Sequence, residues 1–128
     1  NMHFVNTHFM HPDDLLDEDR GAALGWEKLK QRLDEYMTWM NEAAPALRNL
    51  TGSELSGAIE RYSALTVEKE ITDNEVHLHL GNFYDQAYLM VRLNKGTPLH
   101  VTGGKLTQAA GNLYLLSAEQ ENVTIEFE

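Results

Sequence analysis

Residues 75–80 read Glu-Val-His-Leu-His-Leu, and this short stretch decides how the second half of the chain folds. Every second side chain in it is valine or leucine, and the residues between them are polar. Such an alternation predicts a β-strand with one buried face and one face in solvent. We therefore expect His77 and His79, which share the polar face, to point into solvent. The strand ends at the turn signal Gly81-Asn82.

Six further short segments with strand-like composition surround this stretch. They cover residues 65–72, 87–93, 98–102, 105–107, 113–118 and 123–127. Turn residues separate them, including Asp73-Asn74, Gly103-Gly104 and Gly111-Asn112. Seven short strands at this close spacing predict a small antiparallel β-sandwich over residues 65–128.

The first half of the chain has a different pattern, in which apolar residues recur at helical spacing. The pattern predicts one helix over about 26–42, stopped by Pro45, and a second that begins at Thr51. Thr51 and Glu54 have the spacing of a capping box. The apolar and aromatic stripe of the first helix is typical of core packing against a sheet or another helix.

Residues 2–10 predict a strand that is apolar on both faces, followed by a polar loop over 12–25. Strands covered on both faces are typical of parallel sheets and barrels. A lone strand has no neighbour with which to bury two faces. We therefore expect the sequence to be a piece of a larger protein, called the parent protein below, and the fold class to be α+β.

Charge and composition exclude several classes of function. The net charge is −10, which disfavours binding to nucleic acid or to an anionic membrane surface. The chain has no cysteine, so disulfides and zinc–thiolate sites are excluded. No apolar run is long enough to insert into a membrane. An acidic chain suits either a plain solvated surface or a cationic partner.

Polar side chains gather at the predicted end of the first strand. His8, His11, Asp13 and Asp14 lie within seven residues of one another. Catalytic groups collect at strand ends in barrels and doubly wound sheets, and histidine exchanges protons near neutral pH. One interpretation is a catalytic site in which an aspartate orients an imidazole. The alternative is that Asp13 and Asp14 only cap the following turn.

The predicted sandwich carries aromatic and polar side chains that suit a sugar. Tyr84, Tyr88 and Arg92 are candidate substrate-binding residues, because rings stack on pyranose faces and polar groups bind hydroxyls. Core packing of the rings is the alternative. His77 and His79 have the spacing of a metal-binding pair, but a solvated edge explains them better, and we assign no metal ligand.

Motifs spread over nearly the whole chain carry a family resemblance. They are residues 8–14 (His-Phe-Met-His-Pro-Asp-Asp), 25–27 (Gly-Trp-Glu), 51–54 (Thr-Gly-Ser-Glu), 61–62 (Arg-Tyr), Arg92, 103–106 (Gly-Gly-Lys-Leu) and 113–116 (Leu-Tyr-Leu-Leu). The set resembles the C-terminal region of bacterial extracytoplasmic proteins with a polysaccharide-deacetylase-like barrel, such as the Pel exopolysaccharide deacetylases of biofilm-forming bacteria. The resemblance implies that residues 1–63 are the last strand and helices of a (β/α) deacetylase-type barrel.

The resemblance also implies a chemistry and a location. The parent protein would be a periplasmic carbohydrate esterase that uses zinc or a similar divalent metal to remove N-acetyl groups from an amino-sugar polysaccharide. Family members place the metal ligands and the base on earlier strands and a general acid on a late strand. His11 is the best match to that acid, with His8 in reserve, and Asp13 would orient it. The metal and base motifs are absent from this sequence, so we expect the chain to bind no metal and to be inactive alone.

The expected partners follow from this interpretation. They are the upstream catalytic domain, the amino-sugar polysaccharide and other exopolysaccharide export proteins. Two alternative functions stay open for the sandwich. It could bind a sugar chain, with the acidic surface suiting a partly deacetylated glycan. It could also be a structural or interaction module that supports the catalytic domain.

Overall fold

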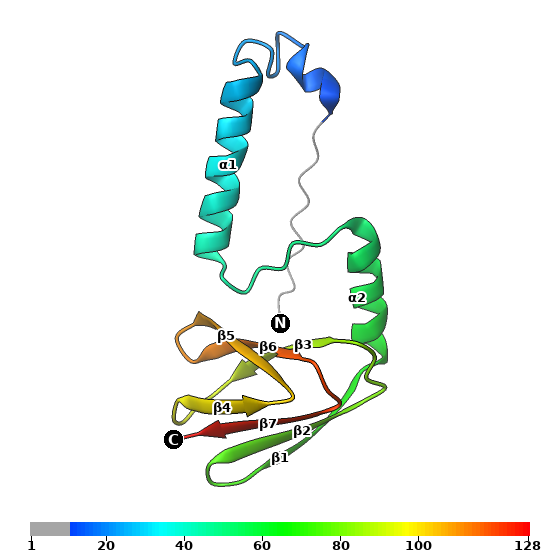
Figure 1. The fold of residues 1–128 in the computed structure, drawn as a ribbon, viewed down its shortest axis with the longest axis vertical. Helices are drawn as coiled ribbons and strands as arrows, with labels where there is room; N and C mark the ends of the chain where they lie inside the picture. Colours follow the sequence, from blue (N-terminus) through cyan, green and yellow to red (C-terminus); the bar gives the residue numbers. More distant parts are fainter. Residues whose placement is uncertain (1–10) are drawn as a thin grey trace. The chain divides into compact units, whose positions relative to one another are not determined.

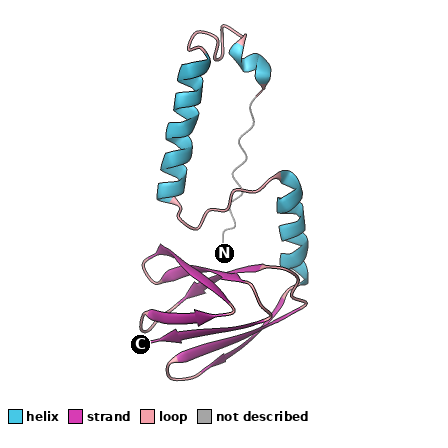
Figure 2. Ribbon diagram, in the orientation of Figure 1, coloured by secondary structure: helices cyan, strands magenta, loops and turns pink. Residues whose placement is uncertain are grey.

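The structure is a computed structural model that describes residues 11–128. The chain divides into two compact units, residues 1–43 and 44–128. The predicted strand over residues 2–10 lies outside the described residues, as does His8. The described residues form two α-helices and two antiparallel sheets, which confirms the α+β class (Figures 1 and 2).

In the part of the first unit that the structure describes, a short 3-10 helix, η1 (Pro12–Leu15), comes first and α1 (Trp26–Ala43) comes last. The predicted helix over 26–42 is therefore confirmed. None of the described side chains of α1 is buried, and Trp26 and Trp39 are 57% and 60% exposed. The other residues of the apolar stripe, Leu29, Leu33, Tyr36, Met37 and Met40, are partly buried.

The second unit begins with a loop and α2 (Gly52–Ala64), whose N-terminus is capped as the sequence predicts. The backbone N–H of Thr51 donates to Glu54 Oε2 at 2.7 Å, and the N–H of Glu54 donates to Thr51 Oγ1 at 3.4 Å. These two bonds satisfy donors that the first helical turn leaves without partners. The helix α2 lies in the same compact unit as the strands.

Seven strands follow, close to the seven segments that the sequence predicts. They are β1 (Thr66–Ile71), β2 (Glu75–Gly81), β3 (Ala87–Arg92), β4 (Pro98–Thr102), β5 (Gly104–Ala110), β6 (Leu113–Ala118) and β7 (Asn122–Phe127). One sheet has the order β1-β2-β7-β4 and the other the order β3-β6-β5, and all neighbours are antiparallel. The chain passes between the sheets at four places, from β2 to β3, from β3 to β4, from β4 to β5 and from β6 to β7.

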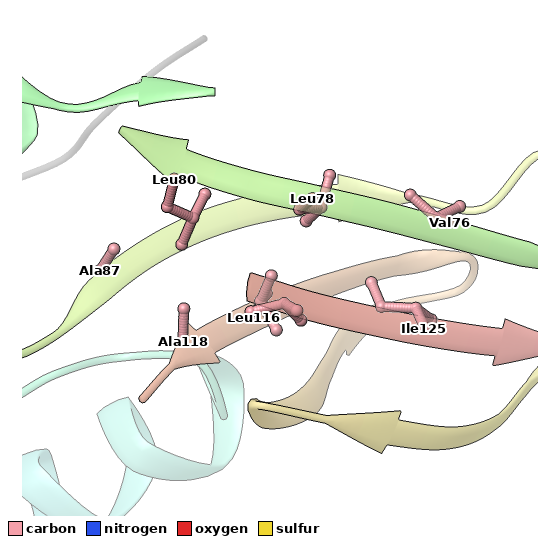
Figure 3. Packing of buried hydrophobic residues seen from close by; sticks show 8 residues of the cluster. Val76, Leu78, Leu80, Ala87, Leu116, Ala118 and Ile125 are labelled. Atoms are coloured by element: carbon pink, nitrogen blue, oxygen red, sulfur yellow. The ribbon is translucent and has the colours of Figure 1, made fainter. Parts of the chain in front are cut away.

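The two sheets share one apolar core. It contains Val76, Leu78, Leu80, Ala87, Leu116, Ala118, Val123 and Ile125, most of which are labelled in Figure 3. Leu80, Leu116 and Ile125 are fully buried, and each side chain contributes about 1.5–3 kcal/mol through its burial. In β2, the polar residues that alternate with these buried residues lie on the opposite face of the strand, as the sequence predicts.

Candidate functional site

The first candidate site lies around η1 in the first unit. Nδ1 of His11 is 3.7 Å from Asp13 Oδ1, and both side chains are more than half exposed. The 3-10 turn places the two side chains close together in space, two positions apart in the sequence. A carboxylate beside an imidazole can orient the ring and stabilise its charged form. The structure thus brings together His11 and Asp13, two of the three residues for which the sequence predicts a catalytic role.

Asp14 fixes the backbone of this turn. Its Oδ2 accepts a hydrogen bond from the backbone N–H of His11 at 3.1 Å, and its Oδ1 pairs with the guanidinium of Arg20. The hydrogen bond from Arg20, followed by that from the His11 backbone, lowers the pKa of the Asp14 carboxyl below its ordinary value. The capping interpretation therefore holds for Asp14, while the Asp13 carboxylate lies beside the His11 imidazole.

A second cluster lies on the outer face of the four-stranded sheet. His77 and His79 point away from the core, and His79 is the more exposed of the two. Nδ1 of His77 is 3.2 Å from Thr124 Oγ1, and Nδ1 of His79 is 3.0 Å from Asn122 Oδ1. Both partners lie on β7, the neighbouring strand. The histidines are therefore held in place by cross-strand contacts.

The other ring nitrogens face carboxylates in different directions along the sheet. Nε2 of His77 is 3.0 Å from Glu75 Oε2, and Nε2 of His79 is 3.8 Å from Glu121 Oε1. The two imidazoles therefore do not converge on one point as metal ligands would. Within residues 11–128, no group of three or more His, Asp or Glu side chains is arranged to hold a metal ion.

An open groove of about 340 Å³ runs across this face. Polar side chains of three strands line it: Glu68, Glu70, His77, His79, Asn122 and Thr124. Of these six residues, the sequence pattern singles out only the two histidines. The register of β1 against β2 places Glu68 opposite His79 and Glu70 opposite His77. The sequence of β1 contains too few apolar residues to show by itself which face of the sheet its glutamates occupy.

The candidate sugar-binding residues fall into two places. Tyr88 and Arg92 lie on the same face of β3, since four positions separate them, whereas Tyr84 lies on the loop between β2 and β3. The guanidinium of Arg48 lies over the Tyr88 ring, 3.7 Å from its centroid, and occupies one face of it. Arg92 donates to Asn112 Oδ1 at 2.9 Å and so braces the turn before β6. Tyr84, by contrast, is 73% exposed.

The described helices were compared with the length and hydropathy that a membrane-spanning helix needs. Neither α1 nor α2 is long and apolar enough to cross a bilayer.

Comparison with known proteins places the chain in a family. Residues 1–115 match the bacterial family described as "Uncharacterised protein conserved in bacteria (DUF2194)". No curated protein and no solved structure matches the chain. Because the family match covers most of the 128 residues, the chain belongs to this bacterial family.

Proposed function

We propose that this chain is the C-terminal part of a periplasmic, metal-dependent polysaccharide N-deacetylase that acts in exopolysaccharide biosynthesis and biofilm formation. In this reaction water adds to the acetamide carbonyl of an amino sugar. The carbon–nitrogen bond then breaks, leaving acetate and a free amine. The observation that carries the proposal is the exposed pair formed by the His11 imidazole and the Asp13 carboxylate.

The role proposed for His11 follows from the chemistry of the leaving group. An amine leaves as a neutral molecule only if its nitrogen gains a proton as the bond breaks, and a positioned imidazolium can supply that proton. Asp13 lies within 3.7 Å of the imidazole and would orient it. Asp14 and Arg20 hold the backbone of the same turn, which carries the imidazole.

The metal of such an enzyme would be bound by other parts of the parent protein. The resemblance assigns its ligands to earlier strands, and residues 11–128 do not offer a suitable cluster. We therefore assign no step through a metal to this chain. Its expected partners are the upstream catalytic domain, the polysaccharide and other export proteins.

A second candidate function is that the sandwich binds a carbohydrate on behalf of the catalytic domain. The exposure of Tyr84 favours it, because a tyrosine ring in solvent is available to stack on a sugar. A purely structural role for the sandwich gives no reason for an exposed ring at this loop.

The reaction itself can be tested with a defined substrate. The parent protein and the 128-residue chain are each incubated with a fully N-acetylated amino-sugar oligomer, and acetate and free amines are measured. The proposal predicts equal amounts of both products with the parent protein and none with the chain alone. Absence of acetate with a folded, metal-loaded parent protein, or release by the chain alone, would contradict it.

A further inference from the structure

The loop between β2 and β3 displays a large ring on a well-anchored backbone. It consists of residues 82–86 and carries the chain from one sheet to the other. Phe83 packs against the core, whereas its neighbour Tyr84 is 73% exposed. One aromatic side chain thus fixes the loop to the sandwich while the next points into solvent.

The backbone of this loop has an uncommon conformation at two residues. Asn82 and Asp85 have φ angles of 58° and 62°. Asn and Asp adopt such angles more readily than other residues with a side chain, so the sequence suits the conformation. These two left-handed residues flank Phe83 and Tyr84, and they set the direction in which each ring leaves the chain.

Hydrogen bonds hold both ends of the loop. Nδ2 of Asn82 donates to the carbonyl oxygen of Ala64 at 3.1 Å. The backbone N–H of Gln86 donates to the carbonyl oxygen of Tyr84 at 2.7 Å, and the Tyr88 hydroxyl donates to Gln86 Oε1 at 2.7 Å. A site that is ordered before binding loses less entropy when a ligand arrives.

The side chains of Tyr84 and Asp85 are available to a ligand. Among residues 11–128, no aromatic or cationic group covers the Tyr84 ring, and no ion pair or hydrogen bond engages the Asp85 carboxylate. Tyr88 provides the contrast, because Arg48 covers its ring and Gln86 binds its hydroxyl. Tyr84 and Asp85 are consecutive residues, so this loop offers one apolar contact and one anionic contact to a ligand.

We propose that this loop binds an amine-bearing sugar unit, with the Tyr84 ring stacked on the pyranose and the Asp85 carboxylate paired with the ammonium group. The apolar CH face of a pyranose complements an aromatic ring, and the ammonium complements a carboxylate. The net charge of −10 favours a cationic chain over a neutral one. The identity of the sugar rests on the proposed function, since deacetylation produces this amine.

Titration of the complete 128-residue chain tests the inference. The probes are a glucosamine tetramer and its fully N-acetylated counterpart, and the readout is the shift of backbone amide signals in two-dimensional NMR spectra. We expect the glucosamine tetramer to shift the signals of residues 82–86 and to bind about tenfold more tightly than the acetylated tetramer. Shifts centred on His77, His79 and Asn122 instead would assign sugar binding to the groove and overturn the inference.

Variants separate the two contacts. Tyr84→Ala is expected to weaken binding at least about tenfold and Tyr84→Phe to preserve it, because the ring makes the contact. Asp85→Asn, which keeps a residue suited to positive φ, is expected to abolish the preference for the amine. Asp73→Asn, in the hairpin between β1 and β2, removes the same charge elsewhere and should change nothing.

Equal affinity of the native chain and Tyr84→Ala, or no shifts at about 10 mM of either tetramer, would overturn the inference. If neither tetramer causes shifts, the exposed Tyr84 ring would instead be assigned to contact with a protein partner. Binding by this loop and acetate release by the parent protein are measured separately. Failure of the one is therefore distinguishable from failure of the other.

Discussion

The carbonyl oxygen of Asn122 packs against Gly103, at the position that a side chain on Gly103 would occupy. A Cβ built on Gly103 overlaps that oxygen, and the φ of Gly103 is 79°. This single residue lies between β4 and β5, where the chain leaves the four-stranded sheet and enters the three-stranded one. The carbonyl oxygen of Gly103 accepts hydrogen bonds from Glu119 and Gln120, at 2.8 and 3.1 Å, in the turn before β7.

Gly103→Ala should therefore destabilise the sandwich. A left-handed conformation costs an alanine about 1–2 kcal/mol, and the overlap adds to it, so we expect a loss of about 3 kcal/mol in urea unfolding. Gly111→Ala is the matched control, because Gly111 has a φ of 54° but no atom near the added Cβ. We expect it to lose about 1 kcal/mol. Equal losses in the two variants would show that the overlap with Asn122 is unimportant.

Leu116 is the test of the shared core. It is fully buried on β6 and belongs to the core cluster that both sheets form. Leu116→Ala should lower the free energy of unfolding by about 2–5 kcal/mol, since it removes buried surface and leaves a cavity. Met90→Ala, on the adjacent strand at a position that is 50% exposed, should cost less than about 1 kcal/mol. A small effect at Leu116 would mean that the sheets do not pack as described.

The cap of α2 makes its stability depend on pH. Hydrogen bonds from the backbone and then the side chain of Thr51 lower the pKa of Glu54 below its ordinary value. Stability from such a carboxylate is fully present above the ordinary pKa of about 4.3 and is lost as the pH falls through the lower folded value. NMR titration should show the pKa of Glu54 rising toward its ordinary value in Thr51→Ala. An unchanged pKa of Glu54 in this variant would show that the Thr51 side chain does not lower it.

Arg20 has the corresponding effect on Asp14. Its hydrogen bond is the largest cause of the lowered pKa of Asp14, with the His11 backbone second. Arg20→Gln should therefore raise the pKa of Asp14 while the bond from His11 remains. Amide signals of residues 11–15 are expected to broaden or shift in the same variant, because Asp14 anchors the turn. If the pKa of Asp14 stays where it was, the ion pair with Arg20 does not form in solution.

The sequence predicted the strands well where alternation is strong and less well where it is weak. Residues 75–80 alternate without exception, and β2 spans Glu75–Gly81. The segment predicted as 105–107 is longer in the structure, because β5 runs from Gly104 to Ala110. Its second half lacks large apolar residues and contains a shift of register between Gln108 and Ala110. No sequence pattern marks that shift.

Sequence alone could not assemble the surface sites. Asn122 and Thr124 lie more than 40 residues from the histidines that they contact, and only the pairing of β2 with β7 brings them together. Arg48 reaches Tyr88 through the folding of the second unit. The pair of His11 and Asp13 was accessible from sequence, because it is local and depends only on the turn that follows Pro12.

The most direct test of the proposed function is acetate release by the parent protein carrying His11→Ala. Loss of a general acid typically costs about 10²–10⁴-fold in rate, so we expect a decrease of that size on an N-acetylated amino-sugar oligomer. Asp13→Asn should give a smaller decrease, and His77→Ala, on the sandwich, should leave the rate unchanged. Undiminished acetate release by a folded His11→Ala protein would contradict the catalytic role assigned to this chain.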